Sequence, residues 1–177
     1  MTLPLFFDHL HQPIFRVVRA GWPNALDASF SKTKIDNRWN MENFAALYCC
    51  CSGQVANAVA EDILNYAGVD RSDLQPDYRP QLISIGWSGN VVDVVTADGV
   101  STARFPPTYP AGVDKSQTRK FAEEWFAASA DGVVCRSASM QRKGFSNWTG
   151  NHENWSEVSI FVDNAVTKPI QINRTDL

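Results

Sequence analysis

The sequence predicts an α+β domain in which a small mixed β-sheet packs against a few helices, and three observations support this class. Short apolar runs typical of buried strands recur along the 177 residues, two segments have helical periodicity, and long stretches rich in turn-forming residues separate them. No internal repeat or low-complexity linker divides the chain. We therefore expect a single domain over residues 1–177, large enough to bury about two thirds of the surface that its unfolded form would expose.

The first half of the chain is expected to form a strand, a long loop, and then a strand–turn–helix unit. Residues 13–18 (PIFRVV) predict a short strand, and residues 20–40 have no steady period and many turn formers, which indicates a loop. Residues 45–51 (AALYCCC) predict a buried strand. Ser52 is a suitable N-cap for a helix that runs to about Ala67 and is closed by Gly68.

The second half is expected to add one helix and most of the remaining sheet. A helix should begin at Asp114 or Ser116, because its apolar side chains from Phe121 to Ala128 recur with the spacing of a face packed on a sheet. The prolines of residues 104–112 and the asparagines of residues 145–155 predict loops. The strands are expected at residues 82–86, 91–96, 131–137 and 157–163, with a short last strand at 168–172.

Charge and composition exclude several classes of function. The net charge is −3 and no segment concentrates lysine or arginine, so we expect neither nucleic acid nor an anionic membrane as a partner. No window approaches the ~20 apolar residues of a spanning helix, and the start lacks a basic leader region, so we expect the protein in the cytoplasm.

A metal site is not expected. Cys49, Cys50 and Cys51 are consecutive, so in a strand their side chains alternate between faces and cannot converge on zinc. They are expected to act as small buried apolar residues. His9 and His11 are close in sequence, but no set of histidine, cysteine and carboxylate residues has the spacing of metal ligands.

Helical geometry places Glu61 away from the side of its helix where Val55, Val59 and Ile63 lie, which by itself indicates a solvated surface residue. Arg38 in DNRWN and Ser137 at a strand end are equally ordinary when each is considered alone. Their order along the chain is what makes them candidates for a functional site.

That order resembles the RES domain family, which is named for an arginine, a glutamate and a serine. The family pattern matches five segments, namely Arg16 in FRVV, Arg38 in NRWN, Tyr48 in ALYC, Glu61 in AVAED and Ser137 in DGVVCRSAS. The resemblance covers residues 14 to 162, nearly the whole chain.

The resemblance implies an ADP-ribosyltransferase-like fold and a toxin of a toxin–antitoxin pair that destroys NAD⁺. Glu61 would then stabilise positive charge at the ribose, hold its hydroxyls, or orient the attacking water or phosphate. Arg38 would bind the pyrophosphate through its planar guanidinium. Tyr48 would stack on the nicotinamide or ribose, and Ser137 would hydrogen-bond the substrate. Arg16 is a second candidate for phosphate binding, with a structural salt bridge as its alternative. We expect Tyr48 and Glu61 to meet in one cleft.

The resemblance leaves several alternatives open. NAD⁺ would be the substrate and no cofactor is expected, but water and inorganic phosphate attack the same carbon, so hydrolysis and phosphorolysis are not separated. ADP-ribosyl transfer to a macromolecule and an inactive binding domain are the alternatives in function. The implied partner is a cognate antitoxin, or an immunity protein if the domain is a secreted effector that acts in a target cell's cytoplasm. It is expected to cover the loops at residues 36–40 and 145–155, whose tryptophans we expect to be exposed.

Overall fold

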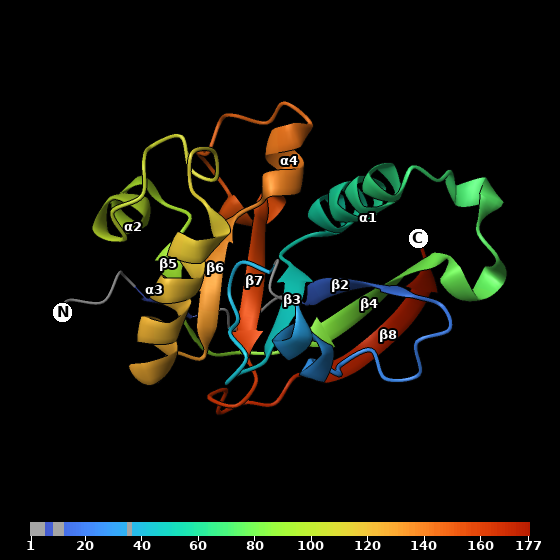
Figure 1. Ribbon diagram of the computed structural model, residues 1–177, viewed down its shortest axis with the longest axis horizontal. Helices are drawn as coiled ribbons and strands as arrows, with labels where there is room; N and C mark the ends of the chain where they lie inside the picture. Colours follow the sequence, from blue (N-terminus) through green and yellow to red (C-terminus); the bar gives the residue numbers. More distant parts are fainter. Residues whose placement is uncertain (1–5, 9–12, 35–36) are drawn as a thin grey trace.

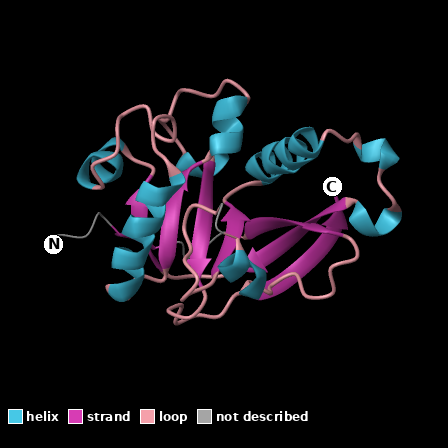
Figure 2. Ribbon diagram, viewed as in Figure 1, coloured by secondary structure: helices cyan, strands magenta, loops and turns pink. Residues whose placement is uncertain are grey.

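The computed structural model describes residues 6–8, 13–34 and 37–177. Within these residues eight strands form one mixed sheet in the order β1-β5-β6-β7-β3-β2-β4-β8 (Figures 1 and 2). Only β5 and β6 pair in parallel among the described strands, and the other neighbours are antiparallel. The strands are β1 (Phe6–Asp8), β2 (Ile14–Arg19), β3 (Ala46–Cys50), β4 (Pro80–Gly86), β5 (Asn90–Val94), β6 (Gly132–Arg136), β7 (Ser156–Phe161) and β8 (Ile170–Asp176). The predicted α+β class is confirmed.

Two longer helices pack on the sheet. In Figure 1, α3 crosses in front of β6, and α1 lies above β2. Both begin at the predicted caps: the Ser52 hydroxyl accepts a hydrogen bond from the Val55 N–H (3.3 Å), and Asp114 accepts from two N–H groups of α3. The α-helices are α1 (Gly53–Ala67), α2 (Ala97–Thr102), α3 (Lys115–Ala127) and α4 (Ala138–Arg142), and the 3₁₀ helices are η1 (Ser29–Thr33), η2 (Arg71–Asp73), η3 (Pro76–Tyr78) and η4 (His152–Asn154).

The sheet divides between β2 and β3, which share only the pair Phe15 and Cys50. From there β3 continues beside β7 and β2 beside β4, so the two halves of the sheet diverge in Figure 2. The 3₁₀ helix η1 is tied to β3, because the Ser31 hydroxyl accepts a hydrogen bond from the Ala46 N–H (2.9 Å). Asn40 in turn donates to the Ser31 carbonyl (2.6 Å), which fixes the loop that carries Arg38 beside β3.

Among the described strands and α-helices, β1, α2 and α4 were not predicted, and neither were the four 3₁₀ helices. The helices α2 and α4 have six and five residues, too few to show a helical period. Both are instead started by side chains: Thr96 caps the N–H of Gly99, and Ser137 caps that of Met140.

His9 and His11 lie outside the described residues. Among the described residues no helix has the length and apolar character needed to cross a membrane.

Candidate functional site

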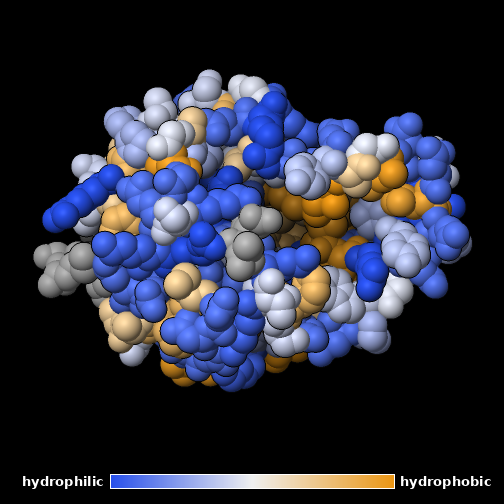
Figure 3. All heavy atoms as spheres, in the orientation of Figure 1, coloured by the Kyte–Doolittle hydropathy of each residue, from blue (hydrophilic) through white to orange (hydrophobic). Residues whose placement is uncertain are grey.

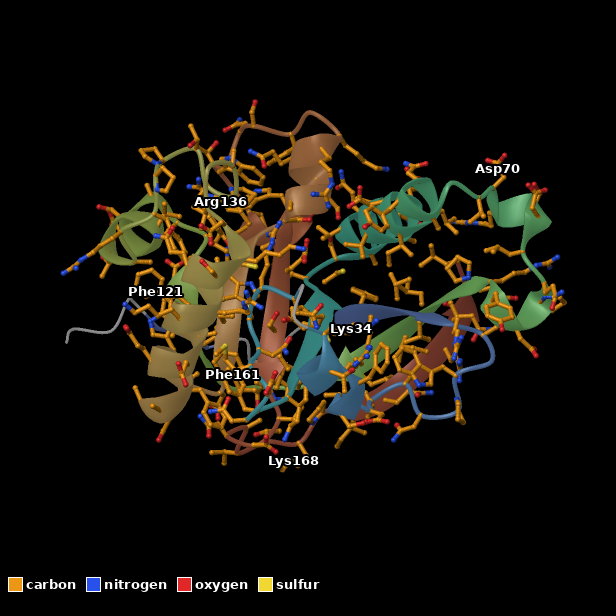
Figure 4. All side chains as sticks on the ribbon, in the orientation of Figure 1. Lys34, Asp70, Phe121, Arg136, Phe161 and Lys168 are labelled. Atoms are coloured by element: carbon orange, nitrogen blue, oxygen red, sulfur yellow. The ribbon has the colours of Figure 1, made fainter. Side chains whose placement is uncertain are left out.

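A serine and a glutamate meet at one end of β6 and β7, beside α4. Ser137 follows the last residue of β6, and its hydroxyl donates a hydrogen bond to Glu157 Oε1 (2.5 Å) near the start of β7. Ser137 is fully buried, whereas part of the Glu157 surface remains accessible. The labels of Arg136 and Phe161 in Figure 4 mark the two ends of this strand pair, and the site lies at the Arg136 end.

Glu157 stands in the middle of the sheet on the face that also carries Tyr48. Its neighbours across the strands are Cys135 on β6 and Cys50 on β3. Burial raises the pKa of the Glu157 carboxyl, and this effect is only partly offset by the positive charge of Arg38 and the hydrogen bond from Ser137. The site therefore contains a recessed carboxylate whose ionised form is held at a cost in free energy.

Arg38 supplies positive charge to the same site. Its guanidinium loses solvation on burial, which lowers its pKa, but Tyr109 and Glu157 oppose this effect strongly enough that the pKa is raised overall. The charge of Arg38 is thus fully maintained within electrostatic range of the carboxylate. A planar cation in this position suits a substrate with phosphate oxygens.

Tyr48 holds the loop of Arg38 in place. Its hydroxyl accepts a hydrogen bond from the Trp39 N–H (2.9 Å) and donates one to Asn40 Oδ1 (2.8 Å). Burial raises the pKa of this phenol, so it remains protonated and keeps both bonds. Tyr48 as a whole is partly exposed, so part of its surface is accessible to a ligand.

The structure does not bring Glu61 to this site. Glu61 is half exposed and forms an ion pair with Lys143 at the end of α4. The next residue, Asp62, pairs with Arg142 and accepts a hydrogen bond from Ser139 (2.9 Å). Glu61 stands about eight residues into α1, which corresponds to roughly 12 Å along the helix axis. The described contacts of Glu61 do not join it to Tyr48, and their meeting in one cleft stays a prediction.

Arg16 also lies apart from Arg38 and Ser137. Its guanidinium stands over the ring of Trp22 at 5.4 Å and donates to the Asp27 carbonyl (3.4 Å). Burial lowers its pKa, while Cys49 and Asp27 oppose this effect. Since Cys49 and Tyr48 are consecutive in β3, they point to opposite faces, and Arg16 is on the side of Cys49.

The model of the RES domain matches residues 13–160, which is most of the chain. The chain belongs to the RES domain family. The crystal structure of the M. tuberculosis MbcT–MbcA toxin–antitoxin complex contains a similar chain, with a TM-score of 0.73 and 15% sequence identity over 99% of this chain and 86% of that chain. No curated protein is a significant match in sequence. The structural likeness fits the expected ADP-ribosyltransferase-like fold.

The tryptophans of this RES domain are less exposed than its sequence predicted. Trp39 is 1% exposed and stacks on Trp125 of α3, with ring centroids 5.7 Å apart. Trp155 is 3% exposed and packs against Phe145 and Trp148. The expectation of exposed tryptophans at both loops is wrong, because these rings close the ends of the core; of the three, only Trp148 is partly exposed.

A cavity of about 800 Å³ opens between α1 and the half of the sheet that contains β2 and β4. Figure 3 shows it as an orange-lined recess below α1. Its wall contains three aromatic rings, those of Trp22, Phe30 and Tyr78, together with aliphatic side chains of α1 and β2. Phe30 belongs to η1, which also anchors the loop of Arg38, so the cavity and the charged site share a structural element.

Glu157 is the residue of the site that the sequence did not reveal. Its strand was predicted, and alternation puts Glu157 on the same face as Ser159 and Phe161. A glutamate at the first position of a predicted strand is usually interpreted as a solvent-exposed residue at the strand end. Only the pairing of β7 between β6 and β3 shows that this face carries the site, and that pairing joins residues about 20 and 100 positions apart in the chain.

Proposed function

We propose that this RES domain cleaves the bond between nicotinamide and ribose in NAD⁺, and that it acts as a toxin. The observation that carries the proposal is the recessed, hydrogen-bonded pair of Ser137 and Glu157 within electrostatic range of the cation of Arg38. Membership of the RES domain family supports the same reaction class, and the toxin in the structural neighbour supports the biological role.

The residue types suit this chemistry. As the bond breaks, the ribose takes on oxocarbenium character, and nicotinamide leaves as a neutral ring because it was cationic in the substrate. No general acid is then needed, and one carboxylate suffices, in contrast to glycosidases that must protonate a leaving oxygen. A carboxylate fixed by a hydrogen bond stabilises the developing positive charge without having to reorganise.

Arg38 would bind the pyrophosphate, and the ring of Tyr48 would contact the nicotinamide or ribose. Ser137 would orient the carboxylate and donate to the substrate only if its hydroxyl changes partner, because the hydroxyl is already engaged. The cavity beside η1 has a volume within the range of ligand pockets, and its aromatic wall would accept the flat base of a dinucleotide.

An enzyme that empties a cell of NAD⁺ must be restrained, so we propose a cognate antitoxin as partner. The solved neighbour is a complex of a toxin with its antitoxin. The inhibitor would block access to Arg38 and Glu157. We propose the cytoplasm as the place of action.

The direct test is incubation of the purified protein with NAD⁺, with and without inorganic phosphate, followed by identification of the products. Free ADP-ribose together with nicotinamide supports hydrolysis, and ADP-ribose 1″-phosphate supports phosphorolysis. Nicotinamide release with ADP-ribose attached to an added protein acceptor would indicate transfer instead. Intact NAD⁺ after prolonged incubation of folded protein would refute the proposal.

A further inference from the structure

We propose that Glu157, and not Glu61, is the carboxylate that faces the ribose in the reaction. The inference rests on the proposed cleavage of NAD⁺ and assigns its central charged group. It differs from what the RES resemblance implies, which places that role on the helix that follows Tyr48.

The two carboxylates differ in position. Glu157 lies on the face of the sheet that carries Tyr48, accepts a hydrogen bond from Ser137 and interacts with the charge of Arg38. Glu157 is therefore related, by a shared face, a hydrogen bond or a charge interaction, to three of the residues in the family pattern. Glu61 has none of these contacts, and its described partner is Lys143.

The orientation of α1 also separates Glu61 from β3. Successive residues of a helix are rotated by about 100°, so Val59 and Glu61 point about 200° apart. Val59 packs against the cluster that contains Cys50 of β3, and Glu61 therefore faces away from that strand. Turning Glu61 toward the sheet would break the ion pair of Asp62 with Arg142 and expose the buried side of the helix.

Keeping Glu157 ionised costs free energy. Its apolar neighbours Cys50 and Cys135 have pKa values raised by burial, so they remain neutral thiols and offer the carboxylate no charge. A carboxylate held at such a cost in the middle of a sheet is typical of functional sites, where stability is given up for reactivity. A role in folding alone would be served as well by a neutral amide.

The reaction step balances with Glu157 in this role. The bond between C1′ of the nicotinamide ribose, which is C1″ in the product ADP-ribose, and the nicotinamide nitrogen breaks. Its electron pair stays on nicotinamide. The Glu157 carboxylate stabilises the positive charge left at C1′. Water then adds to C1′ and releases one proton to solvent, or inorganic phosphate adds as the anion.

The test compares Glu157→Gln with Glu61→Gln, each purified and assayed for NAD⁺ cleavage and thermal stability. Both changes remove one negative charge and preserve shape, so they are matched controls for each other. We expect Glu157→Gln to lower kcat by about two to three orders of magnitude with KM nearly unchanged, because the charge matters mainly in the transition state. We expect Glu61→Gln to keep the parental kcat within about twofold.

The Tm of Glu157→Gln distinguishes a catalytic from a structural role. If Glu157 served only folding, the substitution would lower the Tm, whereas the raised pKa predicts no decrease. Because the pKa of folded Glu157 is raised, its contribution to stability is fully present below the ordinary pKa of 4.5 and is lost as pH rises through the raised pKa. Glutamine does not ionise, so the Glu157→Gln variant does not lose this stability as pH rises. The Tm of Glu157→Gln at pH 7.5 should therefore equal or exceed that of the parent, and the difference should shrink as pH falls.

The pH profile of kcat gives a third readout. The parent should lose activity as pH falls through the raised pKa of Glu157, and Glu61→Gln should keep the same acid limb. The described titratable and charged groups that influence Glu157 or respond to its charge are Arg38, Tyr48, Cys50, Cys51, Asp62, Tyr109, Cys135 and Arg142.

The outcomes separate this inference from the proposed function. If the folded parent does not cleave NAD⁺, both are overturned. If the parent cleaves NAD⁺ and folded Glu157→Gln does so at the parental rate, this inference alone is wrong. A hundredfold loss confined to Glu61→Gln would return the role to α1, and a Glu157→Gln variant that is inactive with a much lower Tm would assign Glu157 to folding.

Discussion

The hydroxyl of Tyr48 joins the core of the domain to its proposed phosphate-binding loop, so Tyr48→Phe tests how that loop is held. The substitution keeps the ring and removes one oxygen. It leaves the Trp39 N–H and Asn40 Oδ1 without their partner, and these two residues are only 1% and 2% exposed. The loss should therefore fall on the loop that carries Arg38 and not on the core itself.

The magnitude follows from the two lost bonds. A buried polar group left without a partner costs about 1–3 kcal/mol, and partial relaxation of the loop leaves an expected loss of about 2–4 kcal/mol. For a domain of this size each kcal/mol lowers the Tm by about 2–4 °C, so we expect a decrease of about 5–15 °C. KM for NAD⁺ should rise, because Arg38 precedes Trp39 and loses its fixed position.

Thermal unfolding measures the first effect, and hydrogen exchange at the Trp39 amide locates it. Tyr66→Phe is the matched control, because Tyr66 is 98% exposed and its change should alter stability by less than about 0.5 kcal/mol. A Tyr48→Phe protein that melts within about 1 °C of the parent, with unchanged protection at Trp39, would refute this account of the loop.

Three further predictions concern the substrate, metals and the partner. Arg38→Lys keeps the charge but loses the fork that matches phosphate oxygens, so KM for NAD⁺ should rise at least tenfold, and parental kinetics would remove Arg38 from the site. Treatment with a chelator should leave NAD⁺ cleavage unchanged, and loss of activity that a single metal restores would contradict this. In the complex with its inhibitor, hydrogen exchange should fall at the loop of Arg38 and at the start of α4, and protection confined to β8 would exclude direct occlusion of the site.

Much of the fold could be read from local sequence because its signals are local. Ser52 and Gly68 bound α1 as predicted, since a side-chain cap and a left-handed residue (φ 66°) act within one turn of the helix. The strands around Tyr48 and Ser137 were found for the same reason, because a run of apolar residues is visible without knowing its neighbours. The short helices α2 and α4 were not predicted, because five or six residues are too few to show a helical period.

The sequence by itself determined the α+β class, most elements and the candidacy of Arg38, Tyr48 and Ser137. Only the tertiary structure decided which carboxylate stands with them. The direction of a helical side chain such as that of Glu61 is set by how the whole helix packs, and the role of Glu157 is set by strand pairing with Cys50 and Cys135. Both depend on contacts between residues far apart in the chain, and no local pattern of residues encodes them.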